Sequence, residues 1–182
     1  MLTSSLYKEV NDPLATEYGL KALAIIAGNV EKDPANARAK QQLATTYSRL
    51  GVTLDNEGEN AKPIVHLEKA VAILQELAQK EAKNRRFTHD LATAFIRLGD
   101  SRHKQREFAP ALKDFDRAAA ILVELSKTDE SDNASRRNLA NAYDSAVKLT
   151  KNWLQPPRAR KRKHIGRWRS STSGLRWTRF AT

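Results

Sequence analysis

The sequence has no cysteine among its 182 residues, which excludes a disulfide-linked scaffold, a thiolate metal site and a thiol nucleophile. Glycine and proline are scarce, at 7 and 6 residues, whereas sandwiches and barrels need turn residues at short intervals. Apolar runs stay far below the roughly 20 residues of a membrane-spanning helix, and residues 1–10 lack the apolar segment of a secretory signal. Alanine and leucine dominate instead, with 26 and 20 residues, and this composition predicts an all-α protein.

Acidic residues are absent from the end of the sequence. All 21 Asp and Glu lie in residues 1–152 together with 23 Lys and Arg, so this part carries a net charge of only +2. Residues 153–182 hold 9 Lys and Arg, all three Trp and no acid. We therefore predict two regions, a helical repeat domain over 1–152 and a disordered basic tail over 153–182.

The helical part repeats itself at a fixed offset of 48 positions. Residues 33–80 align with 81–128 without a gap and share 16 identities. The segment 42–51 returns as 90–99, and its first residues return once more at 138–143. A fixed period of this length indicates stacked units, each too small to bury its apolar face alone.

Each unit is expected to form two antiparallel helices. Leu43, Tyr47, Leu50 and Leu54 follow one another at spacings of 4, 3 and 4, which places them on one helix face. Pro34 suits the first turn of the helix that carries them. The predicted helices cover 13–32, 35–56, 61–80, 83–105, 108–127 and 132–151, as antiparallel neighbours in a right-handed superhelix.

Aromatic and large aliphatic side chains at fixed positions of the repeat are predicted to form the core. They are Tyr47, Leu74, Phe95, Phe115, Leu122 and Tyr143. In the same register Leu2 and Leu6 are equivalent to Leu50 and Leu54, and no second helix follows Tyr143. We therefore expect a repeat array that is incomplete at both ends.

The second unit resembles the tetratricopeptide repeat. The resemblance is carried by Leu98-Gly99 in the first helix and by Phe108, Ala111, Phe115 and Ala118 in the second. The departure is length, because the usual unit has about 34 residues and the present one is longer by about two helical turns in each helix. The resemblance covers roughly residues 1–150 and implies a protein-binding α-solenoid whose first helices line a concave groove.

A narrower resemblance concerns the segments 22–25, 33–38 and 43–51, which read Ala-Leu-Ala-Ile, Asp-Pro-Ala-Asn-Ala-Arg and Leu-Ala-Thr-Thr-Tyr-Ser-Arg-Leu-Gly. They are similar to the long repeats that follow the kinase domain in many bacterial serine/threonine protein kinases. This implies a fragment of the repeat region of such a kinase, or of a related signalling protein.

Catalytic motifs are missing from the sequence. There is no glycine-rich phosphate loop, and Asp114-Phe115-Asp116 lacks the glycine of the kinase metal-binding motif. His66, His89, His103 and His164 do not pair at the helical spacing of a metal site. We predict a protein that is not an enzyme and that needs no cofactor or metal.

The expected function is binding of a protein or peptide segment in the concave groove, or of other domains of a parent chain. The expected location is the cytoplasm, or outside it if the parent chain is anchored in a membrane. The candidate groove residues are Thr45, Ser48, Thr93, Asp100, Lys104, Asn141 and Asp144. The alternative is binding of nucleic acid or of an anionic surface through the tail. Its candidates are Arg158, Arg160, Lys161, Arg162 and Lys163, but we do not expect nucleic acid as the partner.

Overall fold

The computed structural model describes residues 13–56, 62–128 and 132–154, and these residues form α-helices and turns without a β-strand. The helices, in chain order, are α1 (Pro13–Lys32), α2 (Ala37–Asn56), α3 (Lys62–Lys80), α4 (Arg85–Lys104), α5 (Phe108–Thr128) and α6 (Asn133–Leu154). All six are expected from the repeat. The two ends of each differ from the predicted bounds by at most two positions, except that α6 runs further, to Leu154.

Side-chain caps decide where two of the helices begin. The Asn36 side-chain oxygen accepts a hydrogen bond from the backbone N–H of Ala39 at 2.9 Å, which fixes the start of α2. Asp132 caps α6 in the same way through the N–H of Ser135 at 2.9 Å. The prediction for Pro34 is wrong, because Pro34 lies in the turn before this cap rather than in the first turn of α2.

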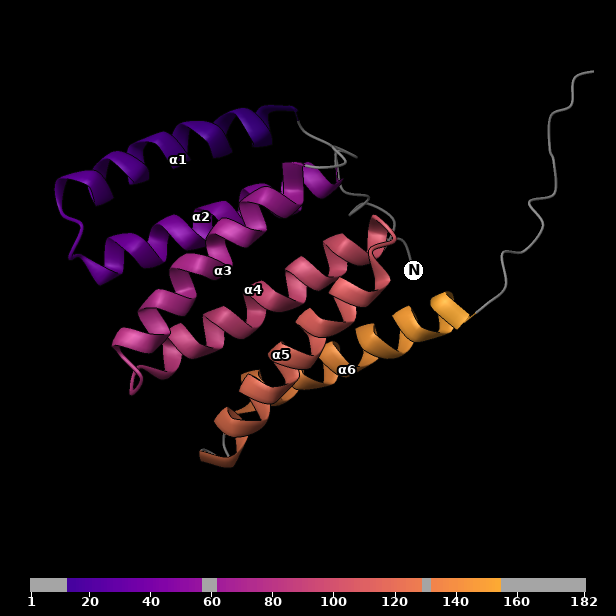
Figure 1. Ribbon diagram of the computed structural model, residues 1–182. Helices are drawn as coiled ribbons and strands as arrows, with labels where there is room; N and C mark the ends of the chain where they lie inside the picture. Colours follow the sequence, from indigo (N-terminus) through magenta and orange to yellow (C-terminus); the bar gives the residue numbers. More distant parts are fainter. Residues whose placement is uncertain (1–12, 57–61, 129–131, 155–182) are drawn as a thin grey trace, which may run out of the picture.

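The helices stack in sequence, as Figure 1 shows from indigo α1 to orange α6. Each helix packs against the next one along the chain, and α1 does not contact α6, so the described helices form an open array rather than a closed bundle. The first helices of successive units, α2, α4 and α6, also approach one another, whereas the backbones of α3 and α5 do not. The stack therefore curves with the first helices on its concave side, and its handedness stays a prediction.

Close packing of glycine against a large side chain joins the two helices of a unit. A Cβ atom placed on Gly51 would lie 2.7 Å from Cγ of Leu67, and one placed on Gly99 would lie 2.7 Å from the Phe115 ring. Real Cβ atoms do not come that close, so hydrogen at these two positions is what allows α2 to touch α3 and α4 to touch α5.

The predicted core is confirmed at Phe115, which is 1% exposed, and also at Leu74, Phe95 and Leu122. Tyr47 is only half-buried, with its ring stacked on His66 at 5.7 Å. The prediction for Tyr143 is wrong: it is 53% exposed, because no described helix covers its face of α6.

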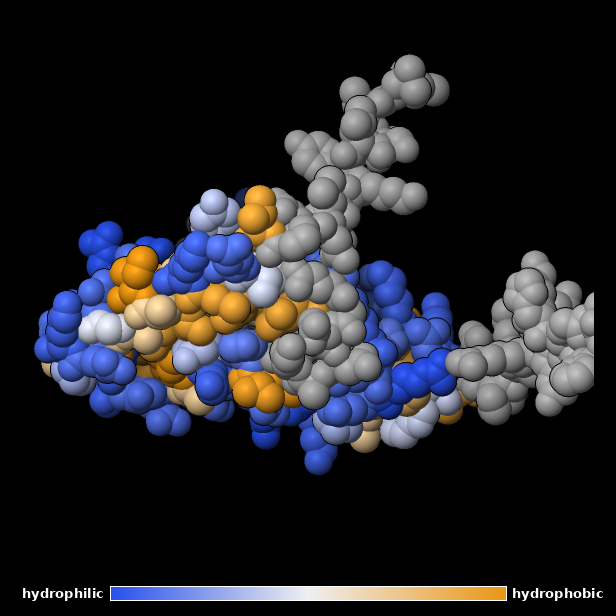
Figure 2. All heavy atoms as spheres, turned by 90° about the horizontal axis from the view of Figure 1, so that it is seen from above, coloured by the Kyte–Doolittle hydropathy of each residue, from blue (hydrophilic) through white to orange (hydrophobic). Residues whose placement is uncertain are grey.

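In the outermost helix α1, none of residues 14–32 is buried, although the sequence of this helix is the most apolar of the six. Only α2 packs against it. Its exposed large apolar side chains are Leu14, Tyr18, Leu20 and Ile25. Figure 2, which views the molecule from the side of α1, shows hydrophobic orange patches between hydrophilic blue ones.

Candidate functional site

The concave face is held together by a ladder of polar contacts between first helices. Each contact joins a residue of one first helix to the residue 49 positions later, on the next first helix. Successive contacts are about two helical turns apart in the pair of α2 with α4 and about four turns apart in the pair of α4 with α6. Between α2 and α4 they are Gln41–Asp90 at 2.6 Å, Ser48–Arg97 at 2.7 Å and Asp55–Lys104 at 2.5 Å. Between α4 and α6 they are His89–Asn138 at 3.1 Å and His103–Asn152 at 3.2 Å.

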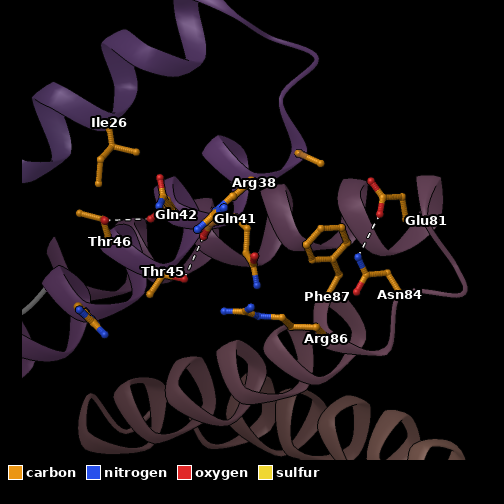
Figure 3. A pocket seen from close by; sticks show the side chains of 12 residues that line it. Ile26, Arg38, Gln41, Gln42, Thr45, Thr46, Glu81, Asn84, Arg86 and Phe87 are labelled. Carbon is orange, nitrogen blue, oxygen red and sulfur yellow. Dashed lines mark hydrogen bonds between the residues drawn. The ribbon is translucent and has the colours of Figure 1, made fainter.

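The largest described cavity lies beside this ladder, bordered by α1, α2 and the start of α4, with a volume of about 970 Å³. Arg38, Arg49 and Arg86 line it, and Glu81 is its one acidic lining residue. Figure 3 shows Arg38 on α2 and Arg86 on α4 bordering one space, on either side of Gln41. The first turns of α2 and α4 also border the cavity, and the positive ends of the two helix dipoles add positive potential.

A fourth arginine adjoins this cavity. Arg97 is the repeat equivalent of Arg49 and donates a hydrogen bond to the Ser48 hydroxyl. Burial and the positive charge of Arg49 lower the pKa of Arg97, while Asp90 raises it. The pKa of Asp90 is lowered despite its burial, because the imidazole of His89 lies 4.0 Å away and Gln41 donates a hydrogen bond to the carboxylate. We call Arg38, Arg49, Arg86 and Arg97 the arginine quartet.

Members of the quartet have no ion-pair partner in the part of the chain that the structure describes. Arginine is always protonated at neutral pH, so four positive charges stand over this part of the concave face against Asp90 and Glu81. The cavity also offers apolar surface from Ile26 and Phe87. The arrangement can hold carboxylates together with an apolar side chain.

The other end of the concave face has a different charge balance. A second cavity of about 350 Å³ is lined by Val52, Asp55, Leu67, Arg97, Asp100, His103 and Lys104. Asp55 is already paired with Lys104. Burial raises the pKa of Asp100, against hydrogen bonding from Ser145 and the charges of His103 and Lys104. Positive and negative groups alternate here, so this end has no strong preference for anions.

The structure brings together some of the residues predicted for the groove. Thr45, Ser48 and Thr93 line one small cavity of about 140 Å³ between α2 and α4. Asp100 and Lys104 share the 350 Å³ cavity. Asn141 is exposed on α6 and Asp144 pairs with Lys148 at 2.5 Å, and neither lines the three cavities described here.

The tail candidates Arg158, Arg160, Lys161, Arg162 and Lys163 lie outside the described residues. Trp153 and Leu154, assigned to the tail from the sequence, belong to α6 in the structure. The Trp153 ring stacks on Phe108 with 6.4 Å between ring centroids.

Sequence reasoning missed the arginine quartet, although the repeat contains a signal for it. Arg38 and Arg86 occupy equivalent positions of successive units, and so do Arg49 and Arg97. Arg38 and Arg49 lie about three helical turns apart, which places them on one helix face. Identical charged residues at repeat-equivalent, same-face positions are therefore the pattern that points to this surface.

No protein-family model matches the chain, and no curated protein sequence matches it. Within residues 13–56, 62–128 and 132–154, no group of three or more His, Asp or Glu is arranged to hold a metal ion. None of the helices in the same ranges is both long and apolar enough to cross a membrane.

Proposed function

We propose that the concave face of α2 and α4 binds an extended acidic segment of a partner protein. The observation that carries the proposal is the arginine quartet, in which Arg38, Arg49 and Arg86 line the large cavity and Arg97 lines the small cavity beside Arg49. None of the four has an ion-pair partner among the described residues. Guanidinium groups bind carboxylates through paired, charge-assisted hydrogen bonds, which are stronger than neutral ones.

The spacing of the quartet limits the shape of the partner. Arg38 and Arg49 lie about three turns of α2 apart, which is about 16 Å along the helix axis. An extended chain advances about 3.3 Å per residue, so roughly five residues cover that distance. The segment we propose carries acidic residues at both ends of such a stretch, with an apolar residue between them to contact Ile26 and Phe87.

A nucleic acid suits this face less well than a peptide does. Its phosphates would continue along the groove past the quartet, where Asp55 and Asp100 line the second cavity. A polyanion gains affinity by neutralising phosphates with consecutive basic groups, and this face has a basic end only. The charge pattern supports a short anionic segment of protein.

The biological setting extends the same proposal. By the resemblance of its repeats, the chain is a non-catalytic tetratricopeptide-like module from the repeat region of a bacterial serine/threonine kinase or a related signalling protein. We place it in the cytoplasm. Its partner is then a segment of another signalling protein or of the parent chain itself.

The test is a fluorescence anisotropy titration of the full chain with a labelled peptide of about ten residues, carrying two acidic clusters about five residues apart. We expect Arg49→Glu to weaken binding at least tenfold, about 1.4 kcal/mol. Lys113→Glu on the exposed side of α5 is the matched charge reversal and should leave the affinity unchanged. A scrambled peptide with adjacent acids should bind more weakly.

Two results would contradict the proposal. One is equal loss of affinity in the Lys113→Glu control, which would mean that overall charge rather than the quartet attracts the peptide. The other is binding that depends on the tail, so that Arg160→Ser with Arg162→Ser abolishes it while the quartet variant binds normally. That result, together with tighter binding to DNA than to the peptide, would favour the nucleic-acid alternative.

A further inference from the structure

Two helix faces at opposite ends of the stack carry exposed aromatic side chains. On α1, Tyr18 is 64% exposed, and on α6, Tyr143 is 53% exposed. Leu14 and Ile25 lie exposed on α1, and Val147 lies exposed on α6. Within the described residues, α1 packs only against α2, and α6 packs against α5 and α4.

The position of α1 and α6 in the repeat indicates whether a first or a second helix of a unit would pack on each exposed face. The helix α1 lies one repeat period before α3 and is a second helix of a unit, whereas α6 lies one period after α4 and is a first helix. In the two complete units, a first helix packs against a second one, α2 on α3 and α4 on α5. Among the described residues, α6 therefore has no second helix of its own unit packed on it, and α1 has no first helix of its own unit.

The glycine contacts of the complete units have a counterpart across these two faces. Gly51 packs on Leu67 and Gly99 packs on Phe115, each with a small residue on the first helix and a large one on the second. The equivalent positions are Val147 on α6 and Gly19 on α1, where an added Cβ atom would also lie 3.1 Å from Leu50 of α2. Here the first helix carries the larger residue, Val147, and the second helix carries the glycine. The pair therefore again combines one small and one large residue.

The aromatic contact has a counterpart as well. In the first unit, the Tyr47 ring stacks on His66 with 5.7 Å between the ring centroids. The equivalent of Tyr47 on α6 is Tyr143, and the equivalent of His66 on α1 is Tyr18. Both are flat rings, and both are exposed in the single chain, as described above.

A cation–π contact is the third feature that matches. The Lys69 ammonium lies 5.4 Å from the Tyr47 ring centroid, and the Arg117 guanidinium lies 5.6 Å from that of Phe95. The equivalent cation on α1 is Lys21, which in the single chain pairs with Glu17 and lies 5.5 Å from the Tyr18 ring centroid. The equivalent ring on α6 is Tyr143.

We propose that a second copy of this chain occupies these faces, with α1 of one copy packed on α6 of the next as its second helix. Three kinds of contact that join helices within a unit would then be repeated between copies: Val147 with Gly19, Tyr143 with Tyr18, and Lys21 with Tyr143. The contact is head to tail, so each added copy presents a new open face. Raising the protein concentration therefore adds copies to the end of the solenoid, and the concave faces of successive copies form one longer surface.

The test is sedimentation of the full chain over a range of concentrations, with one face blocked at a time. Tyr143→Glu blocks α6, and Tyr18→Glu blocks α1; both side chains are exposed, so helical circular dichroism should be unchanged. The unmodified chain should form dimers and longer species with increasing concentration. Each variant alone should associate at least tenfold more weakly, and an equimolar mixture of the two should form dimers and nothing larger.

The matched control is Val65→Glu, an exposed apolar residue of α3 away from both faces, which should associate like the unmodified chain. A chain that stays monomeric at all concentrations would overturn the proposal, and would favour coverage of α1 by residues 1–12 of the same chain. Self-association that survives in each single variant would overturn it as well, since another surface would then be responsible.

Discussion

Two consecutive arginines at the start of α4 have opposite surroundings. Arg85 forms an ion pair with Asp132 at 3.2 Å and donates a hydrogen bond to the carbonyl of Leu125 at 3.0 Å, so it ties α4 to the end of α5 and the start of α6. Arg86 points to the other side, lines the large cavity and has no ion-pair partner among the described residues. Of these two neighbours, Arg85 therefore holds helices together and Arg86 faces the cavity, because their side chains point in different directions.

The same difference separates whole groups of charges. On the side of α4 that faces α5, Arg102 binds Asp114 at 2.6 Å and Glu68 at 2.5 Å. On the concave side, the arginine quartet has no such partners within the described ranges. Paired charges contribute to the fold, whereas unpaired ones keep their hydrogen-bonding capacity for a ligand. Stability measurements should therefore respond to the first group and binding measurements to the second.

The largest expected effect is that of Arg102→Met. Asp114 is 1% exposed, and its pKa is raised by burial although Arg102 opposes the shift. Removing the guanidinium leaves a buried carboxylate without compensation, which costs about 3–5 kcal/mol of unfolding free energy. Urea denaturation at neutral pH measures this loss, and it should shrink at mildly acidic pH, where Asp114 takes up a proton.

Arg49→Met is the matched variant on the concave side. It should change the free energy of unfolding by less than about 0.5 kcal/mol, because no described partner is lost. Equal destabilisation by the two substitutions would contradict the division into paired and unpaired arginines.

A smaller effect is expected from glycines that do or do not touch a neighbouring helix. Gly99→Ala places a Cβ atom 2.7 Å from the Phe115 ring and should cost about 1–3 kcal/mol through overpacking between α4 and α5. Gly28→Ala in α1 meets nothing within 4 Å and should instead stabilise the protein by about 0.5–1 kcal/mol. Thermal melts of the two variants should move in opposite directions, and a shift of both in one direction would show that α4 and α5 are packed differently.

The smallest effect concerns acid stability. Hydrogen bonds from the Ser135 side chain and backbone, together with Arg85, lower the pKa of Asp132 to about 2 from 3.8. A carboxylate with a lowered folded-state pKa stabilises the fold above its unfolded pKa, and this contribution is lost as the pH falls from 3.8 towards 2. Denaturation midpoints should therefore fall less steeply over this interval in Asp132→Asn. If the midpoint of Asp132→Asn fell with pH as steeply as that of the unmodified chain, the ion pair of Asp132 with Arg85 would not contribute to stability.

The fold was predictable to a large extent because burial follows the repeat. The repeat offset predicts all six described helices and the buried positions of Phe95, Phe115 and Leu122. It failed at Tyr143, because the repeat position ensures burial only where a neighbouring helix supplies the cover. Pro34 was misplaced because the Asn36 side chain, and not the proline, caps α2.

The site was less predictable. Thr45, Ser48 and Thr93, which the phase of the first helices assigns to the groove, line one small cavity, but their role in binding stays a prediction. The arginine quartet depends on which charges remain unpaired, and pairing depends on how neighbouring first helices are shifted. The contacts between first helices are offset by one position from the repeat, so Arg97 meets Ser48 and not its own equivalent, Arg49. The single sequence shows the repeat period of 48 but not this one-residue offset between neighbouring first helices.

The most direct measurement of the central claim is an amide NMR titration of the full chain with the two-cluster acidic peptide. The account predicts that chemical-shift changes concentrate on the lining of the 970 Å³ cavity, at Thr45, Thr46, Arg49 and Arg86, and are absent from the exposed face of α5 around Lys113. Changes confined to the tail beyond Leu154, or to α3 and α5, would contradict it, since the unpaired arginines of the concave face would then have no part in binding.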